Sequence, residues 1–124
     1  MKPILAVVLT AVAVGLVAVA AASAAKSPKL KGSVGPGFTI SMSVKPKKAG
    51  TYSITVTDKA SSHNFHISGP GLPKSNTKKV TVATAVGATG TITLKNLKLQ
   101  AGKTYRFVCD PHASAMKGSF KVPT

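Results

Sequence analysis

Residues 104–116 read TYRFVCDPHASAM, and the rest of the chain is best interpreted outward from this stretch. Its first half alternates with period two, which places Tyr105, Phe107 and Cys109 on one face of a predicted strand. Cys109 is the only cysteine of the chain and stands where this strand ends. We therefore expect the sheet to hold the thiol in a fixed position at the start of a short loop.

The loop after this strand carries three donors of the same chemical kind. A thiolate sulfur, an imidazole and a thioether follow one another at Cys109, His112 and Met116. These groups suit copper, and one cysteine with two histidines and a weak axial methionine is the blue-copper arrangement. A lone cysteine has no internal disulfide partner, and a buried inert thiol is the ordinary alternative. The neighbouring histidine and methionine favour a metal site, which needs a second histidine from elsewhere.

The two other histidines of the chain, His63 and His66, lie close together in the sequence. If residues 63–67 form a strand, His63 shares a face with Phe65 and Ile67, and His66 points the other way. Since two apolar side chains favour the core, the same face carries His63 inward. We therefore predict that His63 is the ligand and that His66 is an outward-facing or supporting residue.

The remaining chain shows short alternating segments separated by turn residues and no convincing helical periodicity. This pattern predicts an all-β Greek-key β-sandwich or barrel of about seven to eight strands. Leu97 and Leu99 are expected to fill the core before the turn at residues 101–102. The predicted strands are residues 38–44, with Phe38, Ile40, Met42 and Val44 on a buried face, and residues 52–57, 63–67, 79–83, 91–94, 104–108 and 118–122.

The N-terminal segment differs in composition from the rest. Residues 4–22 are apolar apart from one threonine, and a small-x-small pattern follows at residues 22–24. This predicts a secretory signal peptide over residues 1–24, with an uncleaved membrane anchor as the open alternative because the run approaches the length of a span. Residues 25–32 are then a linker and residues 33–124 one domain. We expect the protein to be exported, to the periplasm, the extracellular space or the outer face of the cytoplasmic membrane.

The chain is strongly basic, with 17 Lys and Arg against two acidic residues and a formal net charge of +15. The basic residues are spread along the sequence and form no recognisable nucleic-acid module, so specific nucleic-acid binding is disfavoured. Spread lysines on an exported domain favour steering toward anionic surfaces. We expect redox partner proteins with an acidic docking surface, or an anionic membrane surface or wall polymer, and a monomeric protein.

Two motifs carry a resemblance to a known family. Residues 63–66, HNFH, and residues 105–116, with the pattern Y-x-F-x-C-x-P-H-x-x-x-M, resemble the cupredoxins. Among these the chain is similar to the small blue copper proteins of the plastocyanin, amicyanin and pseudoazurin type. The likeness covers most of residues 33–124. The three residues between His112 and Met116 are one fewer than in plastocyanin and one more than in amicyanin.

The resemblance implies one type 1 copper ion, with His63, Cys109 and His112 as equatorial ligands and Met116 as the long axial one. It implies that Asn64 ties the two ligand segments together and hydrogen-bonds near the sulfur. The edge of His112 would be the port for electrons. For the groups that surround this port we expect Pro36, Pro70, Leu72 and Ala113.

Three functions compete on the sequence. The favoured one is an exported, mononuclear type 1 copper protein that carries single electrons between redox partners. The second is an extracytoplasmic copper chaperone or scavenger with the same fold, and the third a metal-free sandwich that binds adhesion partners or polyanions. An enzyme is least favoured, because no paired carboxylates and no nucleophile with an adjacent base are found.

Overall fold

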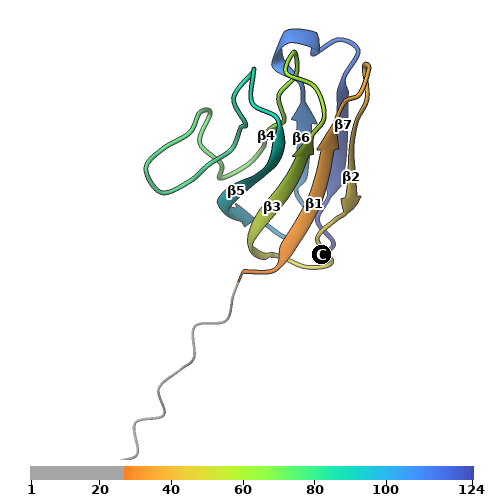
Figure 1. The fold of residues 1–124 in the computed structure, drawn as a ribbon. Helices are drawn as coiled ribbons and strands as arrows, with labels where there is room; N and C mark the ends of the chain where they lie inside the picture. The colour runs from red at the N-terminus through yellow and green to blue at the C-terminus, as the bar shows by residue number, and fades with distance from the viewer. Residues whose placement is uncertain (1–26) are drawn as a thin grey trace, which may run out of the picture.

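The computed structural model describes residues 27–124, which form seven strands in two sheets and one short 3-10 turn, η1 (Figure 1). One sheet has the strand order β2-β1-β3-β5 and the other the order β4-β6-β7. The predicted signal peptide and the first residues of the predicted linker lie outside the described residues. The elements are β1 (Lys29–Val34), β2 (Ile40–Val44), β3 (Gly50–Asp58), β4 (His66–Ser68), β5 (Gly90–Leu99), β6 (Thr104–Val108), η1 (Asp110–His112) and β7 (Lys117–Lys121).

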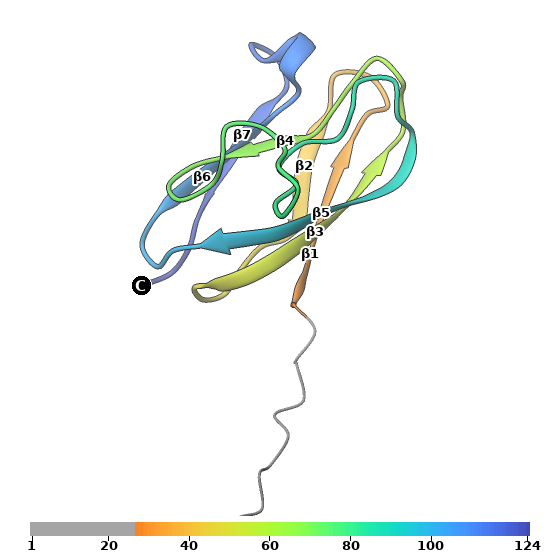
Figure 2. The same ribbon diagram turned by 90° about the vertical axis from the view of Figure 1, so that its left-hand side faces the viewer.

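The two sheets form the layers of a β-sandwich (Figure 2). β1 and β3 run parallel, and the other paired strands are antiparallel. The inward residues of both sheets make one apolar core, which includes Ile54, Leu94, Phe107 and Phe120. Phe65 and Phe107 stack in this core with ring centroids 5.5 Å apart. The predicted all-β sandwich is confirmed.

The predicted linker is wrong over residues 29–32, because these residues belong to strand β1. β1 pairs with both β2 and β3 and so lies inside its sheet. Its period-two signal is weak because Gly32 occupies an inward position between Leu30 and Val34. A Cβ on Gly32 would lie 2.9 Å from the ring of Phe65. The glycine leaves room for that ring, and the strand therefore lacks an apolar side chain where the pattern calls for one.

The predicted strand at residues 79–83 is also wrong, since this segment makes only an isolated bridge between Ala83 and His66. The side chain of Asn76 provides several of the hydrogen bonds that a neighbouring strand would otherwise make. Its Oδ1 accepts the backbone N–H groups of Val82 and Ala83 at 2.8 and 2.9 Å, and its Nδ2 donates to the carbonyl of Ala83. Two N–H groups of this segment are thus satisfied by a side chain, and only scattered backbone hydrogen bonds, such as Ile67 N–H to Val82 and Thr81 N–H to Lys95, join it to the strands.

Strand β5 is longer than the predicted residues 91–94 and continues to Leu99. A register irregularity in its pairing with β3 shifts the parity, so Leu94, Leu97 and Leu99 all face the core. Asn96 adopts a positive φ of 58° at this point, which an asparagine tolerates better than most residues. The prediction that Leu97 and Leu99 fill the core is confirmed.

The buried face predicted for residues 38–44 is only partly confirmed. Met42 is buried, but Phe38 and Val44 are exposed, and the strand begins at Ile40. Phe38 precedes the strand in a loop and lies against His63 and His112 instead.

The topology sends the ends of several elements to one end of the sandwich. β3 and β6 both terminate there, and η1 caps the same end in Figure 1. The start of β1 and the turn between β2 and β3 lie at the opposite end. Within residues 27–124, no helix has the length and apolar character required to cross a membrane.

Candidate metal centre

Three predicted ligand side chains meet at this end of the sandwich, and their donor atoms form a small triangle. The Nδ1 atoms of His63 and His112 lie 3.1 Å apart. The Sγ of Cys109 lies 3.7 Å from the first and 3.6 Å from the second. Cys109 and His63 are buried and His112 is partly exposed. The donor atoms therefore converge on one point from two separate parts of the chain.

The loop after β6 holds two of these ligands by backbone hydrogen bonds. Cys109 follows the last residue of β6, and η1 starts directly after it. The N–H of His112 donates to the carbonyl of Cys109 at 3.0 Å. The N–H of Cys109 donates to the carbonyl of Met116, and the N–H of Met116 donates to the carbonyl of His112. The loop is thus closed on itself, and Met116 is fully buried within it.

The parity argument for the second histidine is confirmed. His63, Phe65 and Ile67 are all buried, whereas His66 lies on the other face and is partly exposed. The strand itself is shorter than predicted and comprises only β4. The residues before β4 are not in a strand, and Asn64 is buried as well, but the N–H of Phe65 is still satisfied, by the Oγ1 of Thr84 at 2.9 Å. His66 is not part of the donor triangle.

The triangle has the dimensions that a trigonal metal site requires. With metal–nitrogen bonds near 2.0 Å and a metal–sulfur bond near 2.3 Å, a planar arrangement needs N···N and N···S separations of about 3.5 and 3.7 Å. The observed separations of 3.1, 3.6 and 3.7 Å lie within a few tenths of an ångström of these values. Two imidazoles and a thiolate are also donors that copper prefers over harder cations.

Comparison with known proteins agrees with this geometry. The model of the family described as copper binding proteins, plastocyanin/azurin family, matches residues 38–123. The chain belongs to this family. The match spans β2 to β7. It includes the segment with His63 and His66 and the loop that carries the other ligands. A comparison with curated proteins gave no match.

Membership of the plastocyanin/azurin family and the donor set together identify the cofactor as a single type 1 copper ion. The set contains one thiolate and two imidazoles, with the buried Met116 in the same loop. When bound, copper supplies a centre that alternates between Cu(II) and Cu(I). The chain supplies the donors and the structure that keeps them in place.

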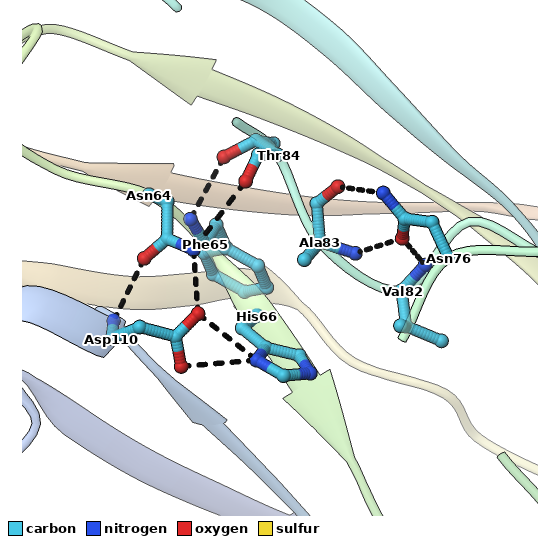
Figure 3. Close-up of polar contacts among 8 residues, drawn as sticks. All are labelled: Asn64, Phe65, His66, Asn76, Val82, Ala83, Thr84 and Asp110. Carbon is cyan, nitrogen blue, oxygen red and sulfur yellow. Dashed lines mark hydrogen bonds and ion pairs between the residues drawn. The ribbon is translucent and has the colours of Figure 1, made fainter. Parts of the chain in front are cut away.

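A polar network beside the triangle joins the two ligand segments (Figure 3). Asn64 donates from Nδ2 to the carboxylate of Asp110 at 2.7 Å, and its Oδ1 accepts the N–H of Asp110 at 2.7 Å. The same carboxylate lies 3.0 Å from the Nδ1 of His66. The expected tie between the segments through Asn64 is therefore present. It is made through Asp110, the residue next to the cysteine.

The sequence did not predict the hydrogen bonds that Asp110 and His66 make in this network. No role was predicted for Asp110, and His66 was predicted to be an outward-facing or supporting residue. The signal that could have found the pair is the parity of the HNFH motif, which puts Asn64 and His66 on the same face of the chain. Both then point toward the residue that follows Cys109, as Figure 3 shows.

The surroundings of His112 differ from the expected ring. Phe38, which is 66% exposed, lies edge-on to the His112 ring with a centroid separation of 5.0 Å. Pro70 and Leu72 lie at the opposite end of the sandwich from the donor triangle. The carbonyl of Pro70 accepts the hydroxyl of Tyr105 at 2.8 Å, near the start of β6, whereas the site lies beyond its end. The prediction is wrong for Pro70 and Leu72 because the loop after β4 runs away from the metal centre.

The carboxyl group of Asp110 has a pKa below its ordinary value of 3.8. Burial raises this pKa, but the hydrogen bonds from Asn64 and His66 and the nearby charge of His66 lower it by more. A lowered pKa in the folded state means that the ionised group contributes stability above the unfolded value. That contribution is lost as the pH falls through the folded pKa.

We therefore expect the free energy of unfolding of the copper-free protein to decrease as the pH falls below about 3.8. The Asp110→Asn variant keeps the shape of the side chain and should show a shallower decrease. Denaturant titrations of both proteins across this range measure the difference. Parallel curves for the two proteins would show that Asp110 does not contribute.

Proposed function

We propose that this protein is a one-electron carrier that exchanges electrons with exported redox partners through its type 1 copper centre. The observation that carries the proposal is the fixed donor triangle of His63, Cys109 and His112. In this proposal the three residues are the equatorial ligands and Met116 is the axial one. Met116 is buried, and its backbone is hydrogen-bonded to Cys109 and His112, which supports its place in the ligand loop.

Rigidity of the ligand frame supports electron transfer. Cys109 is attached to the end of β6, and His63 is held by the segment that precedes β4. The Asn64–Asp110 hydrogen bonds join these two segments directly. A donor set that changes little between Cu(II) and Cu(I) keeps the reorganisation energy small. Such a frame also disfavours metal release, which a copper chaperone requires.

The exposure of the site indicates where a partner would dock. His112 is partly exposed, and the exposed ring of Phe38 packs against it. We propose that electrons enter and leave along the His112 edge, with Phe38 as an apolar contact for the partner. The excess of lysines supports partners with acidic docking surfaces. We also propose that the protein is exported and acts as a monomer.

Reversible redox cycling with copper retained distinguishes the carrier from the copper chaperone. We expect repeated reduction and reoxidation to leave copper bound in the presence of a competing Cu(I) chelator. The coupled measurement is visible absorbance with metal analysis after each cycle. Loss of copper to the chelator on the first reduction would favour the chaperone or scavenger instead.

Met116→Leu tests the axial ligand. We expect this variant to bind copper and to keep its blue colour, but with a higher midpoint potential, because loss of a weak axial donor destabilises Cu(II) more than Cu(I). Redox titration of both proteins measures the shift. Met42→Leu, in the core on β2, is the matched control and should leave the potential unchanged. Equal potentials for all three proteins would remove Met116 from the ligand set.

A further inference from the structure

The surface charge is distributed unevenly between the two ends of the sandwich. Both acidic residues of the chain lie at the copper end. Asp58 is buried at the end of β3, and Asp110 lies in η1. In the described part of the chain, the one recorded salt bridge joins Asp110 to His66. The lysines at the other end therefore have no carboxylate partner within residues 27–124.

The end opposite the copper centre carries a group of exposed lysines, which we call the lysine pole. It is built from the start of β1, the turn between β2 and β3, the end of β5 and the turn before β6. The register places these elements together, since Lys29 pairs with Ser53 and Thr51 with Lys98. The lysine pole consists of Lys29, Lys45, Lys47, Lys48, Lys98 and Lys103.

The lysine pole also contains an apolar groove of about 260 Å³. The lysines at positions 29, 45, 47 and 48 line it together with Leu30, Val44, Pro46 and Tyr52. Val44 is 40% exposed there, although it is a strand residue. The hydroxyl of Tyr52 donates to the carbonyl of Lys48 at 2.7 Å and so holds the turn against the sheet. An apolar floor rimmed by ammonium groups suits the interface of a membrane, where apolar groups enter and lysines reach phosphates.

The path of the chain into the sandwich also favours a membrane surface at the lysine pole. β1 begins at Lys29, in the lysine pole, and the apolar run of residues 4–22 precedes it in the sequence. If the run is retained as an anchor, the chain that follows it enters the sandwich at this pole and not at the copper end. The lysines suit any anionic surface, and the apolar groove and the path of the chain favour anionic lipid over an acidic protein.

We propose that the lysine pole is a docking surface for anionic lipid headgroups. Docking in this way orients the sandwich so that the copper centre faces away from the bilayer. His112 and Phe38 then remain open to a redox partner. The inference does not depend on the proposed electron transfer, because no lysine of the pole touches the donor triangle.

Lysine acetylation followed by mass spectrometry tests this orientation on the full chain. We expect vesicles that contain phosphatidylglycerol to protect Lys45, Lys47 and Lys48, and vesicles of phosphatidylcholine alone to protect them less. Lys74, Lys78 and Lys79, in the loop that extends sideways between β4 and β5 (Figure 1), should remain reactive with both. Equal protection of the two groups, or protection centred on Lys59 and Lys117 at the copper end, would overturn the proposal.

Two triple variants with the same loss of charge provide a matched comparison. Each lysine near an anionic membrane contributes about a factor of five to binding. Replacing Lys45, Lys47 and Lys48 by Gln should therefore lower the ratio of partitioning into anionic over neutral vesicles about 100-fold. The same replacement at Lys74, Lys78 and Lys79 should change this ratio much less. The ratio cancels any contribution that the apolar run makes to both kinds of vesicle.

Three outcomes decide the proposal. A selective loss for the first variant, with the blue band intact, supports it. Equal losses for both variants would show binding by net charge alone and would overturn it. Protection of the pole by a soluble polyglycerol phosphate or by an acidic protein, but not by vesicles, would also overturn it and assign the surface to that partner. The partitioning and protection results do not depend on whether the copper centre is redox-active.

Discussion

His63→Ala is expected to abolish the blue absorption of the copper-loaded protein. His63 contributes one of three donor atoms that lie within 3.7 Å of one another, and alanine offers no donor in its place. Cys109 and His112 would remain in the same loop, so some copper binding can survive without the trigonal geometry. Visible spectroscopy of the Cu(II) form and a copper titration measure the two effects separately.

His66→Ala is the matched control, since it removes an imidazole three residues away from the same segment. It should keep the blue band, because His66 contacts the carboxylate of Asp110 and not the donor triangle. Some stability should be lost with that contact. A blue His63→Ala protein together with a colourless His66→Ala protein would reverse the ligand assignment.

Asn64→Ala is expected to have the second large effect, on stability and on the copper spectrum together. The amide side chain accepts the N–H of Asp110 and donates to its carboxylate. Its removal leaves the N–H without this partner, whereas the carboxylate keeps its contact with His66. A backbone N–H that loses its hydrogen bond costs about 1–3 kcal/mol, so we expect a loss of this order in the free energy of unfolding. Denaturant titration with and without copper measures this loss.

Asn76→Ala provides a control of the same chemistry at a distance from the copper centre. Asn76 also fixes backbone N–H groups, those of Val82 and Ala83, as Figure 3 shows. Its loss should cost about 1–2 kcal/mol, in line with two hydrogen bonds on a partly exposed segment. The copper spectrum should not change. If both variants leave the spectrum unaltered, Asn64 stabilises the fold without positioning the ligands.

The metal centre was largely predictable because its ligands are set by local spacing and by strand parity. The position of Cys109 at the end of an alternating strand, and of His63 on the same face as Phe65, follow from period two alone. Both features hold even where the predicted length of the strand is wrong. β4 is shorter than predicted, and the donor atom of His63 still reaches the triangle.

The errors occur where a non-local contact replaces the local signal. Gly32 faces inward on β1, and the ring of Phe65, distant in sequence, occupies the space where a side chain would lie. Residues 79–83 are an exception, since the nearby Asn76 takes up two of their N–H groups. Pro70 lies far from the copper centre because its carbonyl binds Tyr105. The contacts of Gly32 and Pro70 have no signature in the neighbouring residues, so periodicity and turn composition could not anticipate them.

The paramagnetic-resonance and visible spectra of the protein loaded with one equivalent of Cu(II) test the central claim most directly. Coordination by Cys109, His63 and His112 predicts an intense blue thiolate-to-copper absorption and the narrow copper hyperfine splitting of a type 1 centre. Saturation should occur at one copper per chain. A protein that binds copper and stays colourless when oxidised, with the wide splitting of an ordinary tetragonal site, would contradict the account.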